Sequence, residues 1–489
     1  MRRWAAALAF GLTLASAGFP ASGQPAYDPE PWLADMAQAR EALSAGYANL
    51  DWAVRDRGVN LPRVTTLMEQ RFRAARNDTE ARRVFEQFLE AFADSHLDVE
   101  WPTSDPKPEP SPSAATASAA PPPSLCRSMN YQTRALDLGS TVDKLPGYTP
   151  LATPGSRVLP AGIVKAGERT VGTLRIALFG AQFSPELCEQ AAQARGLKPS
   201  DPCDEHCRYA LERAINDRLT DILAAQLKAL AAAGADTLIV DIGGNGGGSG
   251  WSANAARTVA AGPLRTWPVA LVRHPHHVAM LESRRKDLID AAAKASGEDR
   301  RRLLAAAETA TRAIAEVRRP CDRSAYWRGE PVTCEGLIAP FYLSGWADGE
   351  PGPFASREAA SVLYWPAGEH YAQGAWTGKL LVLVNRHTHS AAEEFAALLQ
   401  DNSAAVIIGA PSGGAGCGHI DGRITERLKH SGGLLVMPNC SRLRADGSNE
   451  VGGIDPDVLV GFRETDSQAQ RARRLAAALP AILAASDRR

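Results

Sequence analysis

Residues 237–250 read Thr-Leu-Ile-Val-Asp-Ile-Gly-Gly-Asn-Gly-Gly-Gly-Ser-Gly, an apolar run that ends in a glycine-rich turn. A continuous apolar run of this kind is typical of a strand that is covered on both faces. Strands that alternate with helices favour a layered α/β core. Further strands are expected at 170–179, 267–273, 380–385, 405–408 and 434–438, and a long helix at 208–233.

The glycine-rich turn at 243–250 is a candidate functional site. Glycines let the backbone expose several N–H groups to a ligand without obstruction by side chains. Phosphate binding is one interpretation, but the turn lacks the Gly-Lys-[Ser/Thr] ending of a P-loop, and its G-x-G-x-x-G match has little weight where glycine is so frequent. An oxyanion hole is the alternative.

Ser390 is the candidate nucleophile. It follows the apolar strand 380–384 and precedes a helix that we expect to begin near Ala391, which places its hydroxyl at a helix N-terminus. Free N–H groups and the positive end of the helix dipole favour negative charge there, as an activated oxygen or an oxyanion requires. Serine is also a common helix N-cap, and the local sequence alone favours that simpler interpretation.

The N-terminus predicts export. Arg2 and Arg3 precede an apolar run of about 11 residues and then Ala15-Ser16-Ala17, the pattern of a cleaved signal peptide over residues 1–17. The run is too short for a membrane span, which needs ~20 residues. We therefore expect a periplasmic or secreted protein with no membrane span once the signal is removed.

In an exported protein the eight cysteines predict up to four disulfides. Cys321 with Cys334 would close a short loop, and Cys417 with Cys440 would join two segments near Ser390. Other pairings stay open, because spacing does not fix connectivity.

A metal site is the competing interpretation for two groups of residues. Cys203 and Cys207 flank His206 and could bind zinc, but no CxxC pair suggests the remaining ligands of a tetrahedral site. The histidines at 274–277 lack a carboxylate or cysteine at ligand spacing, so surface positions are expected for them. The sequence therefore predicts neither a bound metal nor a cofactor.

Composition and periodicity divide the chain into segments. Apolar residues at spacings of three and four predict N-terminal helices over 36–54, 64–72 and 84–92, the last capped at 77–79. The insertion at 281–319 is either a solvated helical hairpin or a lid over a cleft. The predicted organisation is a signal peptide at 1–17, a helical subdomain at 28–100, a Pro/Ala/Ser-rich linker at 101–124, a connecting segment without a clear PDZ module at 125–170, an α/β core at 171–465 that carries the insertion, and a C-terminal helix at 466–489.

The charge balance argues against nucleic acid as a partner. Lys and Arg number 54 and Asp and Glu number 55, so no excess of positive charge is available to neutralise phosphates. The oligomeric state is not indicated by the sequence.

Several motifs together resemble the family of tail-specific, or C-terminal-processing, proteases and the core of the tricorn protease. The resemblance covers most of the chain, and the pieces occur in the family's order. They are Asp94-Ser95-His96, the strand 171–179, the turn 241–248, the segment His387 to Phe395, Gly409-Ala410-Pro411-Ser412-Gly413-Gly414 and the segment Glu450 to Asp457.

The resemblance implies a crotonase-like α/β core of the ClpP/crotonase kind, preceded by a helical subdomain. It implies a serine endopeptidase in which Ser390 is the nucleophile. Backbone N–H groups of Gly246, Gly247 and Ala391 would then form the oxyanion hole. Protein or peptide chains would be the substrates.

The resemblance also suggests which base activates the serine. In the Ser/Lys branch a lysine flanked by glycines follows the Gly409 strand, but here that position is Ala415. The tricorn-like branch uses a histidine preceded by serine and a downstream glutamate, and the chain has Ser95, His96 and Glu450. We expect His96 to take the proton of Ser390, with Glu450, acting through or beside Ser95, orienting the imidazole.

Two other classes of function were weighed against the peptidase. Relatives that include retinoid-binding repeats use the same fold without proteolysis, so a non-catalytic ligand-binding or scaffolding protein is the main alternative. An esterase of the α/β-hydrolase type is disfavoured, because Ser390 lies outside any G-x-S-x-G motif and the order of the candidate residues differs.

Overall fold

The computed structural model describes residues 27–102, 125–131 and 140–487. The predicted signal peptide and all but the first two residues of the predicted linker lie outside the described residues. No helix in the described ranges is long and apolar enough to cross a membrane.

A seven-stranded sheet forms the centre of the molecule, in the order β13-β9-β8-β5-β4-β3-β2. Five of its strands, β4, β5, β8, β9 and β13, run parallel, whereas β2 and β3 add antiparallel strands at one edge. The sheet therefore begins before residue 171, where the core was expected to start. Its strands are β2 (Thr149–Pro150), β3 (Ala161–Ala166), β4 (Arg169–Arg175), β5 (Thr237–Asp241), β8 (Lys379–Val384), β9 (Val406–Gly409) and β13 (Val458–Leu459).

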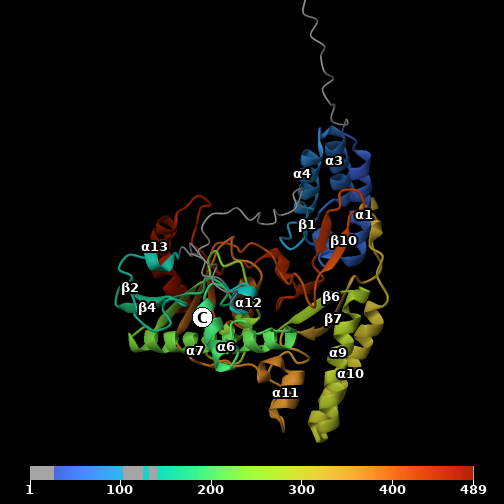
Figure 1. Cartoon of the computed structure of the whole chain (residues 1–489). Helices are drawn as coiled ribbons and strands as arrows, with labels where there is room; N and C mark the ends of the chain where they lie inside the picture. Colours follow the sequence, from blue (N-terminus) through green and yellow to red (C-terminus); the bar gives the residue numbers. More distant parts are fainter. Residues whose placement is uncertain (1–26, 103–124, 132–139, 488–489) are drawn as a thin grey trace, which may run out of the picture.

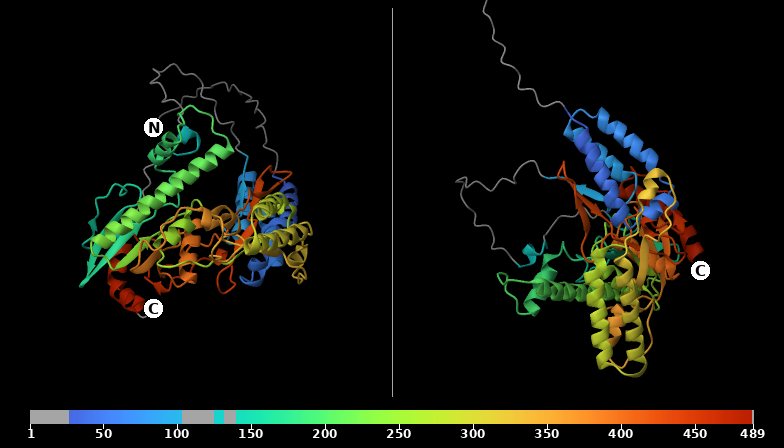
Figure 2. Two further views of the ribbon diagram at one scale, coloured as in Figure 1. Left: turned by 90° about the horizontal axis from the view of Figure 1, so that it is seen from below. Right: turned by 90° about the vertical axis from the view of Figure 1, so that its right-hand side faces the viewer.

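Both faces of this sheet are covered, as the apolar run of β5 predicts. Leu238 and Val240 pack into one hydrophobic cluster with α7 (Glu205–Ala232), α8 (Trp251–Val259) and α12 (Ala391–Asp401). Ile239 points to the other face and packs with α13 (Gln468–Ser486). The long helix α7 runs along the sheet and α13 lies against its far side (Figures 1 and 2). The layered α/β prediction is confirmed.

The N-terminal helices form a separate bundle at the other end of the molecule from β2, β4 and α13 (Figure 1). One helix was expected over residues 36–54, but the chain forms two, because α1 ends at Gly46 and a turn at Tyr47–Asn49 precedes α2. Asn77 caps the last helix as predicted, accepting a hydrogen bond from the N–H of Glu80. The helices are α1 (Glu30–Gly46), α2 (Leu50–Arg55), α3 (Leu61–Ala74) and α4 (Asp78–Glu90).

These helices pack on a small antiparallel sheet, β1-β11-β10, that joins distant parts of the sequence. β1 (Asp98–Glu100) follows the helices, whereas β10 (Ile424–Arg427) and β11 (Leu434–Met437) come from the C-terminal third. His96, just before β1, is thereby brought to the C-terminal segment.

A third sheet, β12-β6-β7, carries the helical insertion. The insertion is a hairpin of α9 (Val278–Lys294) and α10 (Gly297–Val317) that projects from the body of the molecule (Figure 2). The strands are β6 (Pro268–Val272), β7 (Leu337–Tyr342) and β12 (Cys440–Arg442). The remaining α-helices of the described ranges are α5 (Leu125–Ser128), α6 (Pro185–Ala194) and α11 (Arg357–Leu363).

All eight cysteines form disulfides, in four pairs. The two pairings considered from the sequence, Cys321–Cys334 and Cys417–Cys440, are both present. Cys203 pairs with Cys207, so neither thiolate is free to bind zinc. The fourth bond joins Cys126 to Cys188.

Candidate active site

Ser390 sits at the turn between β8 and α12 with φ 55° and ψ −121°. This left-handed backbone is strained for any residue with a side chain and costs roughly 1–3 kcal/mol, so the surrounding contacts must impose it. The residue is half-buried, while the helix that follows is buried along its first turn. The turn therefore presents the serine at the surface of a rigid core.

The glycine-rich turn lies directly against Ser390. A Cβ on Gly247 would lie 2.8 Å from Cβ of Ser390 and 3.1 Å from the backbone nitrogen of Ala391. With φ 110°, this position also requires glycine for its conformation. The backbone of the turn can thus approach the nucleophile closely.

The three predicted oxyanion donors differ in their hydrogen bonds. The N–H of Gly247 donates to Oδ1 of Asn245 at 2.8 Å, so this group is already used. Within the described ranges, the N–H groups of Gly246 and Ala391 have no acceptor. These two groups are the ones free to receive an oxyanion.

Asp241 supports this turn from below. Its Oδ1 accepts the N–H of Gly243 at 2.9 Å and is held by Nη1 of Arg175 at 3.1 Å, and both side chains of that ion pair are buried. The family commonly has an arginine at the position of Gly243. A Cβ at that position would meet Nδ2 of Asn385 at 2.9 Å, so a larger residue would have to displace this neighbour.

His96 is fixed by a contact that the sequence did not predict. Its Nδ1 lies 2.8 Å from the carbonyl oxygen of Ala415. A carbonyl oxygen only accepts hydrogen bonds, so Nδ1 is the donor, and in the neutral ring Nε2 is then the nitrogen with the free lone pair. The face of the ring packs against Gly418, where a Cβ would lie 2.9 to 3.0 Å from Nε2, Cδ2 and Cε1. The ring of His96 is therefore held by the Ala415 carbonyl, and across the described residues no hydrogen bond joins His96 to Ser390.

The backbone of His96 is also held in place. Its N–H donates to Oδ1 of Asp94, and the other carboxylate oxygen of Asp94 accepts from Tyr47 and Asn49. His419 lies beside His96, with 5.8 Å between the ring centroids. Burial, helped by the neighbouring His96, lowers the pKa of His419 to about 4.

The structure places Ser95 and Glu450 differently from the prediction. Ser95 is exposed, and across the described residues its side chain makes no hydrogen bond to His96 or Glu450. Glu450 is buried, and both of its carboxylate oxygens accept from Nε of Arg442 at 3.0 Å. The structure therefore does not place Glu450 next to His96 through Ser95.

Burial raises the pKa of Glu450 to about 7, because desolvation and the nearby Glu393 and Glu394 outweigh the attraction of Arg442. Burial alone would lower the pKa of Arg442, but Glu450 and Glu394 hold it above its usual range. The guanidinium thus stays charged while several carboxyls share it.

The other histidines near Ser390 and in the 274–277 segment differ in burial. The ring of His389 lies against Gly413, and the backbone N–H of His389 donates to the carbonyl of Asn245. His387 is exposed, whereas His277 is fully buried. The surface position expected for His277 is therefore wrong, and burial lowers its pKa to about 4. Among the described residues, no group of three or more His, Cys, Asp or Glu side chains could hold a metal ion.

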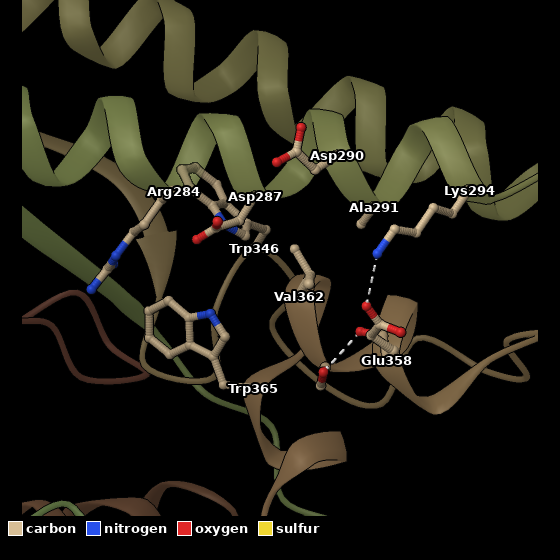
Figure 3. A pocket seen from close by; sticks show the side chains of 10 residues that line it. Arg284, Asp287, Asp290, Ala291, Lys294, Trp346, Glu358, Val362 and Trp365 are labelled. Atoms are coloured by element: carbon tan, nitrogen blue, oxygen red, sulfur yellow. Dashed lines mark hydrogen bonds and ion pairs between the residues drawn. The ribbon is translucent and has the colours of Figure 1, made fainter. Parts of the chain in front are cut away.

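A pocket of about 420 Å³ lies elsewhere, between α9 and α11 (Figure 3). The side chains of Trp346 and Trp365 line it on one side, and a Lys294–Glu358 ion pair lies at its far end. None of the predicted catalytic residues lines this pocket.

Comparison with known proteins identifies the fold and the family. No relative matches this chain among curated protein sequences. Among solved structures, mature CPAF in complex with lactacystin is 14% identical, with 94% of this chain and 99% of that chain covered and a TM-score of 0.57. Mature CPAF alone gives 14% identity, coverage of 94% and 98%, and a TM-score of 0.55. A structure from Parabacteroides merdae, described as a peptidase, is 14% identical, with 95% of this chain and 99% of that chain covered and a TM-score of 0.46.

At such low identity the CPAF structures establish the fold only. The family model for peptidase family S41 matches residues 213–460, which is just over half of the 489 residues and includes Ser390, Ala415 and Glu450. The chain therefore belongs to peptidase family S41 and is a serine-type peptidase.

Proposed function

We propose that this protein is an exported serine endopeptidase in which Ser390 is the nucleophile and His96 the general base. The observation that carries the proposal is the hydrogen bond from Nδ1 of His96 to the carbonyl of Ala415. It leaves Nε2 as the basic atom of an oriented imidazole, which is the state that a proton acceptor for serine requires. Ala415 stands where the Ser/Lys branch of the family has its lysine base, so a histidine base is needed instead.

The reaction follows from this assignment. Nε2 of His96 accepts the hydroxyl proton as Oγ of Ser390 forms a bond to the carbonyl carbon of the substrate peptide. The resulting oxyanion would be bound by the N–H groups of Gly246 and Ala391, which have no other acceptor in the described ranges. The imidazolium returns its proton to the leaving amine as the C–N bond breaks. Water then hydrolyses the acyl-enzyme by the same proton transfers in reverse.

Two parts of the predicted relay change in this proposal. Glu450 remains the associated acid, but its contact with Arg442 supports an indirect effect on the site. The exposed position of Ser95 offers no contact that supports a role in proton transfer. The core of the relay is therefore the pair of Ser390 and His96.

Export to the periplasm or the medium is part of the proposal. Four disulfides are typical of proteins that fold in an oxidising compartment. The signal-peptide pattern at residues 1–17 supports the same location.

Labelling with a fluorophosphonate, followed by mapping of the adduct, tests the nucleophile. We expect label on Ser390, and a loss of at least ~10³-fold in kcat on unfolded protein substrates for Ser390→Ala and for His96→Ala, because the pair acts as a unit. His387→Ala is the matched control, since this exposed histidine lies three residues from the nucleophile. Label on another serine, or full activity of Ser390→Ala, would refute the assignment.

A further inference from the structure

Glu393 lies in the first turn of α12, three residues after Ser390, and its side chain is completely buried. Its carboxylate accepts four hydrogen bonds. One comes from the N–H of Ser390 at 3.0 Å, and the others come from Oγ of Ser412 at 2.5 Å and the N–H groups of Gly414 and Ala415 at 2.7 and 2.8 Å. Glu393 thus joins the nucleophile's backbone to the loop 412–415.

Arg442, at the end of β12, joins the same two segments through their carbonyl groups. Its Nη2 donates to the carbonyl oxygen of Ser390 at 3.0 Å and to that of Gly416 at 2.8 Å. Its remaining N–H groups donate to Glu450 and Glu394, so the guanidinium is held on its other side. The residue is itself buried.

The two side chains therefore form a clamp around Ser390, with Glu393 holding its N–H and Arg442 holding its carbonyl. The same clamp holds the loop on either side of the Ala415 carbonyl, through the N–H of Ala415 and the carbonyl of Gly416. The Ala415 carbonyl is the group that binds Nδ1 of His96. A shift of the clamp would consequently move the nucleophile and the orienting partner of the base together.

We propose that Glu393 and Arg442 are positioning residues that set the geometry between Ser390 and His96, and that Glu450 acts by holding Arg442. This inference rests on the proposed function, since it takes Ser390 as nucleophile and His96 as base. In this inference the His96 ring is oriented by the main-chain carbonyl of Ala415, and not by direct contact with a catalytic acid. A misplacement of reacting groups by about 1 Å costs on the order of 10²-fold in rate.

Arg442→Lys and Glu393→Gln test the clamp. Lysine keeps the charge, but its single nitrogen cannot bind the two carbonyls and the two carboxylates that Nη2, Nε and Nη1 of Arg442 bind together. Glutamine places an amide N–H₂ against N–H donors. We expect kcat to fall about 10²-fold in each variant with KM changed less than about 3-fold. Arg444→Lys is the matched control. Arg444 lies two residues after Arg442 and forms a similarly buried ion pair with Asp401, but it touches neither Ser390 nor the loop.

A second readout distinguishes positioning from general destabilisation. In protein labelled with 15N-histidine, the His96 signals are assigned by their loss in His96→Ala. Wild type is expected to show a protonated Nδ1 and an unprotonated Nε2, and both clamp variants a mixture of tautomers. Arg444→Lys should match wild type. A purely structural role would lower the melting temperature without changing the tautomer.

The outcomes separate this inference from the proposed function. If fluorophosphonate fails to label Ser390 in wild type, the proposed function is wrong. If labelling and the His96 requirement hold but both clamp variants keep wild-type kcat, or lose no more than Arg444→Lys, the clamp alone is refuted. Should the clamp variants fail to fold, the wild-type spectrum still decides, because an unprotonated Nδ1 would overturn the inference.

Discussion

The carbonyl of Ala415 accepts a hydrogen bond from Nδ1 of His96, across 319 positions of sequence. The Ser/Lys branch of this family has its lysine base at the position of Ala415. Here the side chain is only a methyl group, and the main chain of the same residue contacts His96, the base that we propose. The two arrangements thus share one backbone position and differ in which atom of it contributes.

Gly418 packs against the face of this imidazole and leaves no room for a side chain. Its φ is 68°, and a Cβ would lie 2.9 Å from Nε2 of His96. We expect Gly418→Ala to displace the ring and reduce kcat by at least about 10-fold, since small errors in geometry are costly. Gly422→Ala controls for backbone strain, because Gly422 also has positive φ (86°) but its nearest neighbour is 3.8 Å away. Steady-state kinetics in which both variants lose activity equally would contradict the steric argument.

Gly247 is expected to be equally intolerant, for a different reason. Gly247→Ala would place a methyl group against Ser390 and the N–H of Ala391, filling the space proposed for the oxyanion. We expect a loss of about 10²-fold or more in kcat and in the rate of fluorophosphonate labelling. Gly244→Ala, in the same turn and with φ 80° but no neighbour within 4 Å, should share only the backbone strain. Normal labelling of Gly247→Ala would show that the oxyanion does not occupy the space between Gly247 and the N–H of Ala391.

Much of the fold was predictable because its signals are local. The apolar run 237–242 predicts a strand that is covered on both faces, and Asn77 caps α4 as the sequence indicates. The break after Gly46 was missed because apolar spacing continues through the turn into α2. The pairing of β1 with β11 was missed because a three-residue strand has no periodicity to detect.

The site was predictable only in part, for the same reason. Ser390 and His96 are reactive residue types in recognisable motifs. Glu393 and Arg442 carry no such signal, because a glutamate at the third position of a helix resembles an ordinary capping residue. The bond from His96 to Ala415 involves a main-chain carbonyl, which no side-chain pattern can indicate.

The Cys417–Cys440 disulfide should affect catalysis as well as stability. Cys417 follows Gly416, which Arg442 holds, and Cys440 begins β12, which carries Arg442. Replacing both cysteines by serine should destabilise the fold by about 3 kcal/mol, the value expected for closing a loop of this length, and should also lower kcat. The control is Cys203→Ser with Cys207→Ser, a bond that closes four positions far from Ser390 in sequence. Chemical denaturation and kinetics together would show whether only the first pair affects the site.

Glu450 predicts a specific dependence of stability on pH. Its pKa in the folded protein is raised to about 7 from an ordinary value of 4.5 by burial and by the neighbouring Glu393 and Glu394. Between these pH values the folded state binds more protons than the unfolded state, so the free energy of unfolding should fall as pH rises from about 4.5 to about 7. It should then level off, because Glu450 is ionised in both states.

Glu450→Gln removes this titration while keeping the shape of the side chain. The variant should lose the contribution of Glu450 to the pH slope, on the order of 3 kcal/mol across the window, as measured by urea unfolding at a series of pH values. Glu308→Gln, at an exposed position of α10, should keep the wild-type slope. If Glu450→Gln retains the same slope as wild type, Glu450 is not the group that takes up the proton in this pH range.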